Sequence, residues 1–169
     1  MECSPYVLAA SLLANLQANL ADTRAGAADR IAVYPHQEPA VEFCDSMAWV
    51  GIGAIGPAQT KPVGGCGVLT WRLTLTMGVH RCYPVTEDGS APDAAAVDSA
   101  ARDILDDGEA MRRAVTSAFE DEQPQITGWR PVPPQGGSHG SRMDVQVEMA
   151  WGAYTEPRAP MLPGDPRQP

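Results

Sequence analysis

The spacing of apolar residues near the start of the chain predicts an amphipathic helix. Leucines recur at every fourth position from Leu8 to Leu20, which places them on one helical face. Ser4 is a suitable N-cap, and Pro5 suits the first helical position, where its missing N–H costs nothing. Gly26 marks the expected stop. We therefore expect a helix that begins at Pro5 and buries one leucine stripe.

Two later segments alternate strictly between apolar and polar residues, which predicts long strands with one buried face. The first covers residues 69–79, with His80 and the threonines on its polar face, and the second covers residues 143–151. Weaker strands are expected over residues 41–55, where Gly51 and Gly53 interrupt the pattern, and over residues 126–132.

The intervening segments predict a second helix and several turns. Asp93 is positioned to cap a helix that continues to about Phe119. Asp107 and Gly108 predict a kink or short break within it, because glycine weakens a helix interior. Residues 31–34 are followed by a turn at Pro35, and residues 133–140 are expected to form a loop.

The two clear strands belong to an internal repeat. Gly64-Gly65 precedes the first and Gly136-Gly137 precedes the second, and the two glycine pairs stand 72 residues apart. Each strand also follows a helix and a strand that contains tryptophan, Trp49 or Trp129. The order α-β-β-α-β-β predicts an α+β fold, in which the duplicated α-β-β unit gives a four-stranded antiparallel sheet with helices packed on one face. Residues 1–151 form this predicted α+β domain.

Residues 152–169 differ from the rest of the chain, and we expect them to form an extended proline-rich arm. Prolines recur there at every third position, which matches the three residues per turn of a polyproline II helix. A disordered tail is the alternative. The proposed partner-binding residues of this arm are Pro157, Pro160, Pro163, Pro166 and Pro169.

The charge balance argues against a general nucleic-acid-binding protein. The formal net charge is −9, whereas such proteins carry surplus Lys and Arg. Eleven acidic and only three basic residues lie between Glu87 and Glu122. This segment is either a solvated helix face or a docking face for a basic partner.

No catalytic, metal or cofactor motif emerges. Ser46 lacks a GxSxG context, and Ser138-His139 are merely adjacent. His36, His80 and His139 stand in unrelated contexts and are interpreted as surface or edge residues. The four cysteines show no CxxC spacing and are expected to be reduced, half-buried thiols. No signal peptide or membrane-spanning run is present, so we expect a soluble product of the cytoplasm. Because no catalytic motif is found, we expect neither enzymatic activity nor a cofactor.

Several short motifs occur along residues 5–151. They are Gly64-Gly65-Cys66-Gly67, Trp71-Arg72-Leu73-Thr74-Leu75, Arg81-Cys82, Pro84-Val85, Ala110-Met111-Arg112-Arg113-Ala114-Val115 and Gly128-Trp129. In these motifs and their spacing, about residues 5–151 of the chain resemble tail terminator proteins of long-tailed (siphovirus-type) phages that infect actinobacteria. The ring-forming domain that the resemblance implies is residues 1–151.

What the resemblance implies is a virion protein at the head–tail junction. Its subunits would form a hexameric ring on the tail tube protein, stop tube polymerisation, and offer a surface to the head–tail connector or stopper protein. Genomic DNA would pass through the lumen without specific binding. The alternatives are another connector component, such as a stopper or adaptor, or a small cytoplasmic ligand-binding module or enzyme.

Overall fold

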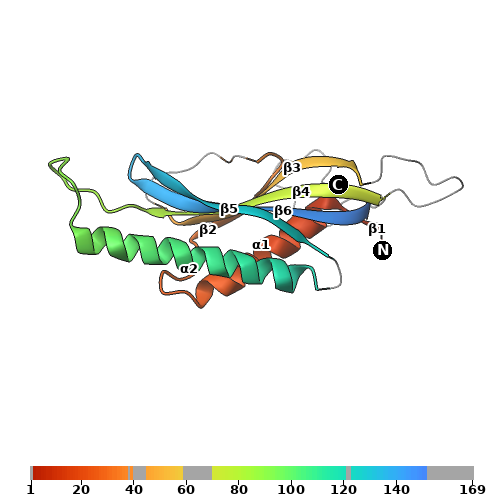
Figure 1. Ribbon diagram of the computed structural model, residues 1–169, viewed down its shortest axis with the longest axis horizontal. Coiled ribbons are helices and arrows are strands. Elements are labelled where there is room, and N and C mark those ends of the chain that lie inside the picture. Colours follow the sequence, from red (N-terminus) through yellow and green to blue (C-terminus); the bar gives the residue numbers. More distant parts are fainter. Residues whose placement is uncertain (1, 38, 40–44, 59–69, 121–122, 152–169) are drawn as a thin grey trace, which may run out of the picture.

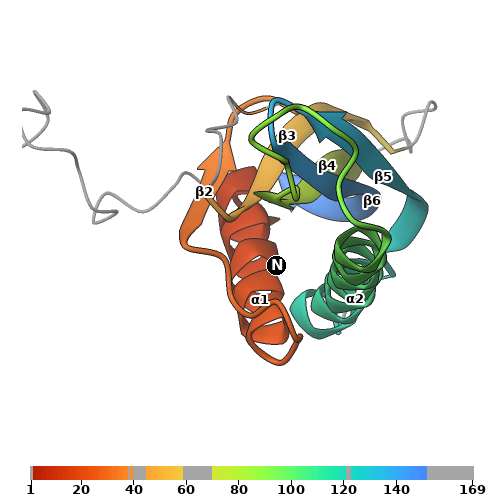
Figure 2. The same cartoon turned by 90° about the vertical axis from the view of Figure 1, so that its left-hand side faces the viewer.

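The computed structural model describes residues 2–37, 39, 45–58, 70–120 and 123–151. Within them, two helices cover the same face of one sheet (Figures 1 and 2). The elements in chain order are β1 (Glu2–Cys3), α1 (Pro5–Ala21), β2 (Arg30–Tyr34), β3 (Met47–Pro57), β4 (Thr70–Cys82), α2 (Ala94–Ala118), β5 (Gln125–Gln135) and β6 (Ser138–Trp151). The predicted α+β class is confirmed.

The predicted four-stranded antiparallel sheet is wrong in its strand number and direction. Strands β3, β4, β6 and β5 are antiparallel neighbours in that order, as expected for the four predicted strands. Strand β2 adds a parallel partner to β3, and β1 pairs in parallel with the end of β6, beyond the part that pairs with β5. The sheet is therefore mixed and six-stranded. Strands β1 and β2, with two and five residues, are too short to show an alternating pattern. The direction in which strands pair depends on the connection between them, and local sequence patterns do not encode it.

The pairing of β4 with β6 agrees with an internal duplication. Leu73 pairs with Val147, and Leu75 pairs with Val145. Between them Thr74 pairs with Gln146, the residue that stands 72 positions later. An approximate twofold axis therefore passes between β4 and β6 at this pair. The glycine pair that precedes β4 lies outside the described residues.

The core lies between the sheet and the two helices. Helix α1 contributes the predicted leucine stripe, including the fully buried Leu12, Leu16 and Leu20. The alternating residues of β4 and β6 face these leucines and the apolar side of α2. The backbone carbonyl of Ser4 accepts hydrogen bonds from the first turn of α1, so the helix begins where predicted.

Helix α2 is continuous, and the predicted break at Asp107-Gly108 is absent. Asp93 caps the helix as predicted, since its carboxylate accepts a hydrogen bond from the Ala95 N–H at 3.2 Å. Asp107 is fully buried and accepts hydrogen bonds from Arg81 of the sheet, so it does not interrupt the helix. Tertiary contacts thus outweigh the weak helix propensity of these two positions.

Strands β5 and β6 form a tight hairpin, so the predicted loop over residues 133–140 is wrong. Gln135 pairs with Ser138, which leaves Gly136 and Gly137 as a two-residue turn. Both glycines have positive φ, 55° and 82°, as a type I′ hairpin turn requires. Prolines within β5 suggested a loop, but an edge strand tolerates them where no N–H is needed.

The predicted arm, including Pro157, Pro160, Pro163, Pro166 and Pro169, lies outside the described residues. Neither described helix is long and apolar enough to cross a membrane.

Candidate interaction surface

An apolar groove lies between the first half of α2 and β5, and we treat it as the candidate site. Its volume is about 430 Å³. The walls are formed by Ile104 and Leu105 from α2 and by Trp129, Pro131 and Pro133 from β5. Tyr83, which follows β4, also lines it. Leu105 is 62% exposed, which is unusual for a large apolar side chain beside other apolar groups.

The groove wall on β5 rests on helix α2. The indole of Trp129 packs against Gly108, where a Cβ atom would lie only 2.9 Å from the Trp129 Nε1. Gly108 therefore allows the strand to approach the helix closely. Trp129 also packs against the central core while part of it remains accessible in the groove.

A buried ion pair fixes α2 to the sheet directly below this groove. Arg81 of β4 donates two hydrogen bonds to Asp107, from Nε to Oδ2 at 2.8 Å and from Nη2 to Oδ1 at 2.7 Å. The same guanidinium donates to the carbonyl groups of Ala25 and Gly26, in the loop after α1. Burial raises the pKa of the Asp107 carboxyl, and the hydrogen bonds from Arg81 oppose that shift. Arg81 thus joins β4, α2 and the α1–β2 loop.

The acidic surplus of α2 is largely matched by nearby arginines. Asp103 accepts a hydrogen bond from Arg24 at 2.7 Å, and Arg24 also donates to the Ser99 carbonyl. Glu109 accepts hydrogen bonds from Arg112 and Arg113, which lower its pKa to about 2. These exposed pairs favour a solvated helix face over a basic-partner docking face for this part of α2.

His80 and His139 are both buried, so their predicted surface positions are wrong, whereas His36 is exposed as expected. His139 lines the groove and meets the Tyr83 ring edge-on, with 5.1 Å between centroids. His80 stacks on Trp49 on the other face of the sheet, with 6.5 Å between centroids. The Arg142 guanidinium lies 5.6 Å from the centroid of the Trp49 ring. A second small core therefore forms on the face away from the helices.

We expect His80 to make the protein less stable in mild acid. Burial, Arg142 and His139 lower the pKa of His80 to about 4, whereas an unfolded histidine titrates near 6.5. Between these values the unfolded state binds a proton that the native state does not. Stability should fall by up to about 1.4 kcal/mol per pH unit as pH drops from roughly 6.5 to 4.

Urea unfolding at a series of pH values measures this slope. The variant His80→Gln should reduce it to the part contributed by His139, whose pKa burial also lowers, while His36→Gln, at an exposed position, should leave it unchanged. An equal slope in the wild type and His80→Gln would assign the acid sensitivity to other groups.

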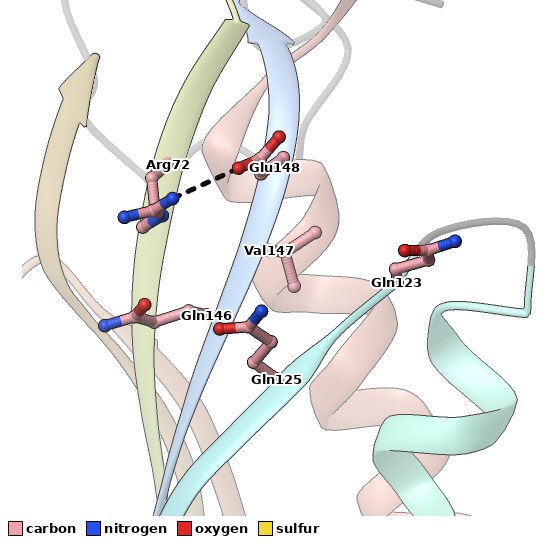
Figure 3. Close-up of a pocket in the computed structure, with 6 residues that line it drawn as sticks. All are labelled: Arg72, Gln123, Gln125, Gln146, Val147 and Glu148. Carbon is pink, nitrogen blue, oxygen red and sulfur yellow. Dashed lines mark hydrogen bonds and ion pairs between the residues drawn. The ribbon is translucent and has the colours of Figure 1, made fainter. Parts of the chain in front are cut away.

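A polar hollow of about 350 Å³ lies beside β4, β6 and the start of β5 (Figure 3). Gln123, Gln125 and Gln146 line it with amide groups. Arg72 and Glu148, also in its wall, form an ion pair at 3.2 Å. Such a lining offers hydrogen bonds but no acid–base pair with separate roles.

In the part of the chain that the structure describes, the candidate serine and histidine side chains do not lie in a catalytic arrangement. Ser138 and His139 are successive residues of β6 and therefore face opposite sides of the sheet. The Ser46 hydroxyl donates a hydrogen bond to Asp29 at 2.7 Å and accepts one from the Asp29 N–H. No group of three or more His, Cys, Asp or Glu side chains within the described ranges could hold a metal ion. Cys82 is exposed at the end of β4, so the expected half-buried position is wrong for this cysteine, while Cys44 and Cys66 lie outside those ranges.

The two outer edges of the sheet are unlike each other. Over the described residues, β2 pairs only with β3, and its Ile31 side chain is 47% exposed. At the opposite side, β5 carries Pro131, Pro133 and Pro134, which lack the N–H groups that an added strand would need. The groove lies on this second side. The described part of the molecule thus presents an open strand at one edge and an apolar groove at the other.

Comparison with known protein families and with curated proteins gives no match for this chain.

Proposed function

We propose that this chain is a phage tail terminator, a ring-forming subunit that caps the tail tube and joins it to the head connector. The observation that carries the proposal is the pair of unlike surfaces at opposite edges of the sheet. Contacts between unlike surfaces run head to tail and close into a ring when the rotation allows. The short motifs around Trp71, Arg81 and Trp129 support the specific assignment, because they resemble that family.

A tube-elongation assay tests the proposal. The tail tube protein from the same genome is polymerised with and without this chain, and tube lengths are measured by negative-stain electron microscopy. Rings should appear at one end of each tube, and that end should stop growing. Sedimentation velocity should give a hexamer mass for the free or tube-bound ring.

Two outcomes would contradict the proposal. A stable monomer that leaves tube lengths unchanged would exclude a terminator. A ring that binds the head connector but has no effect on tubes would indicate a stopper or adaptor instead.

A further inference from the structure

We infer that the apolar groove between α2 and β5 receives the proline-rich segment 152–169 of an adjacent copy of this chain. The inference rests on the proposed ring, and it names one of the contacts that join neighbouring subunits.

The chemistry of the groove suits a polyproline II segment. Such segments bind in aromatic-lined apolar grooves, and they arrive with little conformational entropy left to lose. Here Trp129 and Tyr83 supply the aromatic rings, and Leu105 adds exposed apolar surface. Segment 152–169 carries prolines at every third position, with Met161 and Leu162 between two of them.

The prolines of β5 favour this occupant over a strand. An added strand needs alternating N–H and carbonyl groups along the edge, and Pro131, Pro133 and Pro134 interrupt the donors. A polyproline II segment needs no such ladder, because its backbone makes no regular hydrogen bonds. The groove can therefore bind it through side chains alone.

Distances favour the arm of another copy. The near end of the groove is Trp129, which pairs with Met143, eight residues before Trp151 in β6. At about 3.4 Å per residue, this separates the groove from the end of β6 by roughly 27 Å. A polyproline II segment that leaves Trp151 advances about 3.1 Å per residue, so Pro157 reaches only roughly 19 Å. Within one subunit, Pro157 therefore cannot reach the groove and Pro160 only just reaches its near end, whereas the arm of a neighbouring copy is not limited by this distance.

Charge contributes little to this contact. Segment 152–169 contains Glu156 and Asp165 against Arg158 and Arg167, so it is formally neutral. The lining of the groove is mostly apolar and carries no Asp, Glu, Lys or Arg side chain. Binding should therefore be insensitive to salt, unlike a contact between the acidic α2 surface and a basic partner.

Photo-crosslinking of the full chain tests the inference. A benzophenone amino acid replaces Leu162, and ¹⁴N- and ¹⁵N-labelled chains are refolded together before irradiation. Mass spectrometry should find cross-links from position 162 to α2 or β5 residues of the groove, in peptide pairs of mixed isotope. The yield should be similar at 0.1 M and 1 M NaCl, two conditions that differ about threefold in screening length.

Matched variants define the groove. Leu105→Asp, at an exposed helix position, should reduce the mixed-isotope yield at least tenfold, whereas Val7→Asp on α1, 46% exposed, should not change it. Circular dichroism verifies that both variants remain folded.

Four results would overturn the inference: cross-links within one chain, cross-links that avoid the groove, no effect of Leu105→Asp, or a yield that collapses at 1 M NaCl. Oligomers without arm–groove cross-links would reject this contact and leave the ring standing. Cross-links without any effect on tube growth would reject only the terminator function.

Discussion

Replacing Arg81 by alanine is expected to lower the free energy of unfolding by about 3–5 kcal/mol, the cost of stranding a buried charge. Asp107 is fully buried, and Arg81 is its partner in two hydrogen bonds of 2.7 and 2.8 Å. The substitution also leaves the carbonyl groups of Ala25 and Gly26 without the guanidinium. Urea unfolding followed by circular dichroism at pH 7 measures the change.

An exposed ion pair supplies the matched control. Arg72 pairs with Glu148 at 3.2 Å, and both side chains are about half exposed. Arg72→Ala should therefore cost no more than about 1 kcal/mol. The double variant Arg81→Met with Asp107→Leu should recover most of the lost free energy of unfolding. The reason is that the cost of desolvating a buried ion pair is about as large as the attraction between its charges. Equal losses for Arg81→Ala and Arg72→Ala would show that Asp107 is hydrated.

Trp49→Ala is expected to lower the free energy of unfolding by a similar amount, about 3–5 kcal/mol, because it leaves a cavity in the small core on the face away from the helices. Trp49 is fully buried and lies across its pairing partner Gly78, where a Cβ atom would come within 2.5 Å of the indole. His80 and Arg142 border the same ring. Chemical unfolding measures the loss.

The close approach of Trp49 to Gly78 provides a coupled test. Gly78→Ala alone should cost about 1–3 kcal/mol by overpacking against the indole. In the Trp49→Ala background the same change should cost much less, because the space is then free. Trp71→Ala, at a half-buried position of β4, serves as the comparison and should lose less than Trp49→Ala. Additive effects of the two substitutions would contradict the described contact.

Periodicity predicted the parts of the fold that depend on burial of one continuous face. The alternation around Leu73 and Val145 predicted β4 and β6, and the leucine stripe around Leu16 predicted α1. These patterns are long, so several positions agree on one face. The parallel strands β1 and β2 escaped prediction because they are short and are defined by partners elsewhere in the chain.

The apolar groove was harder to predict from the sequence. Tyr83, Leu105, Trp129 and Pro133 come from separate segments, and only the packing of β5 on α2 brings them together. Asp107 followed by Gly108 suggested a helix break because local propensity cannot anticipate Arg81 or Trp129. The period-three prolines signalled an interaction in the sequence, but they lie outside the described residues, and none of them is among the described residues that line the groove.

The position of β6 has a consequence for the order of folding. This strand pairs with β4 along one edge and with β5 and β1 along the other, yet it is the last described strand to leave the ribosome. The apolar edge of β4 in the β3–β4 hairpin therefore lacks its partner β6 while α2 and β5 are translated. Pairings of such long sequence separation form slowly. During synthesis the nascent chain thus exposes an aggregation-prone edge until residue 151 emerges.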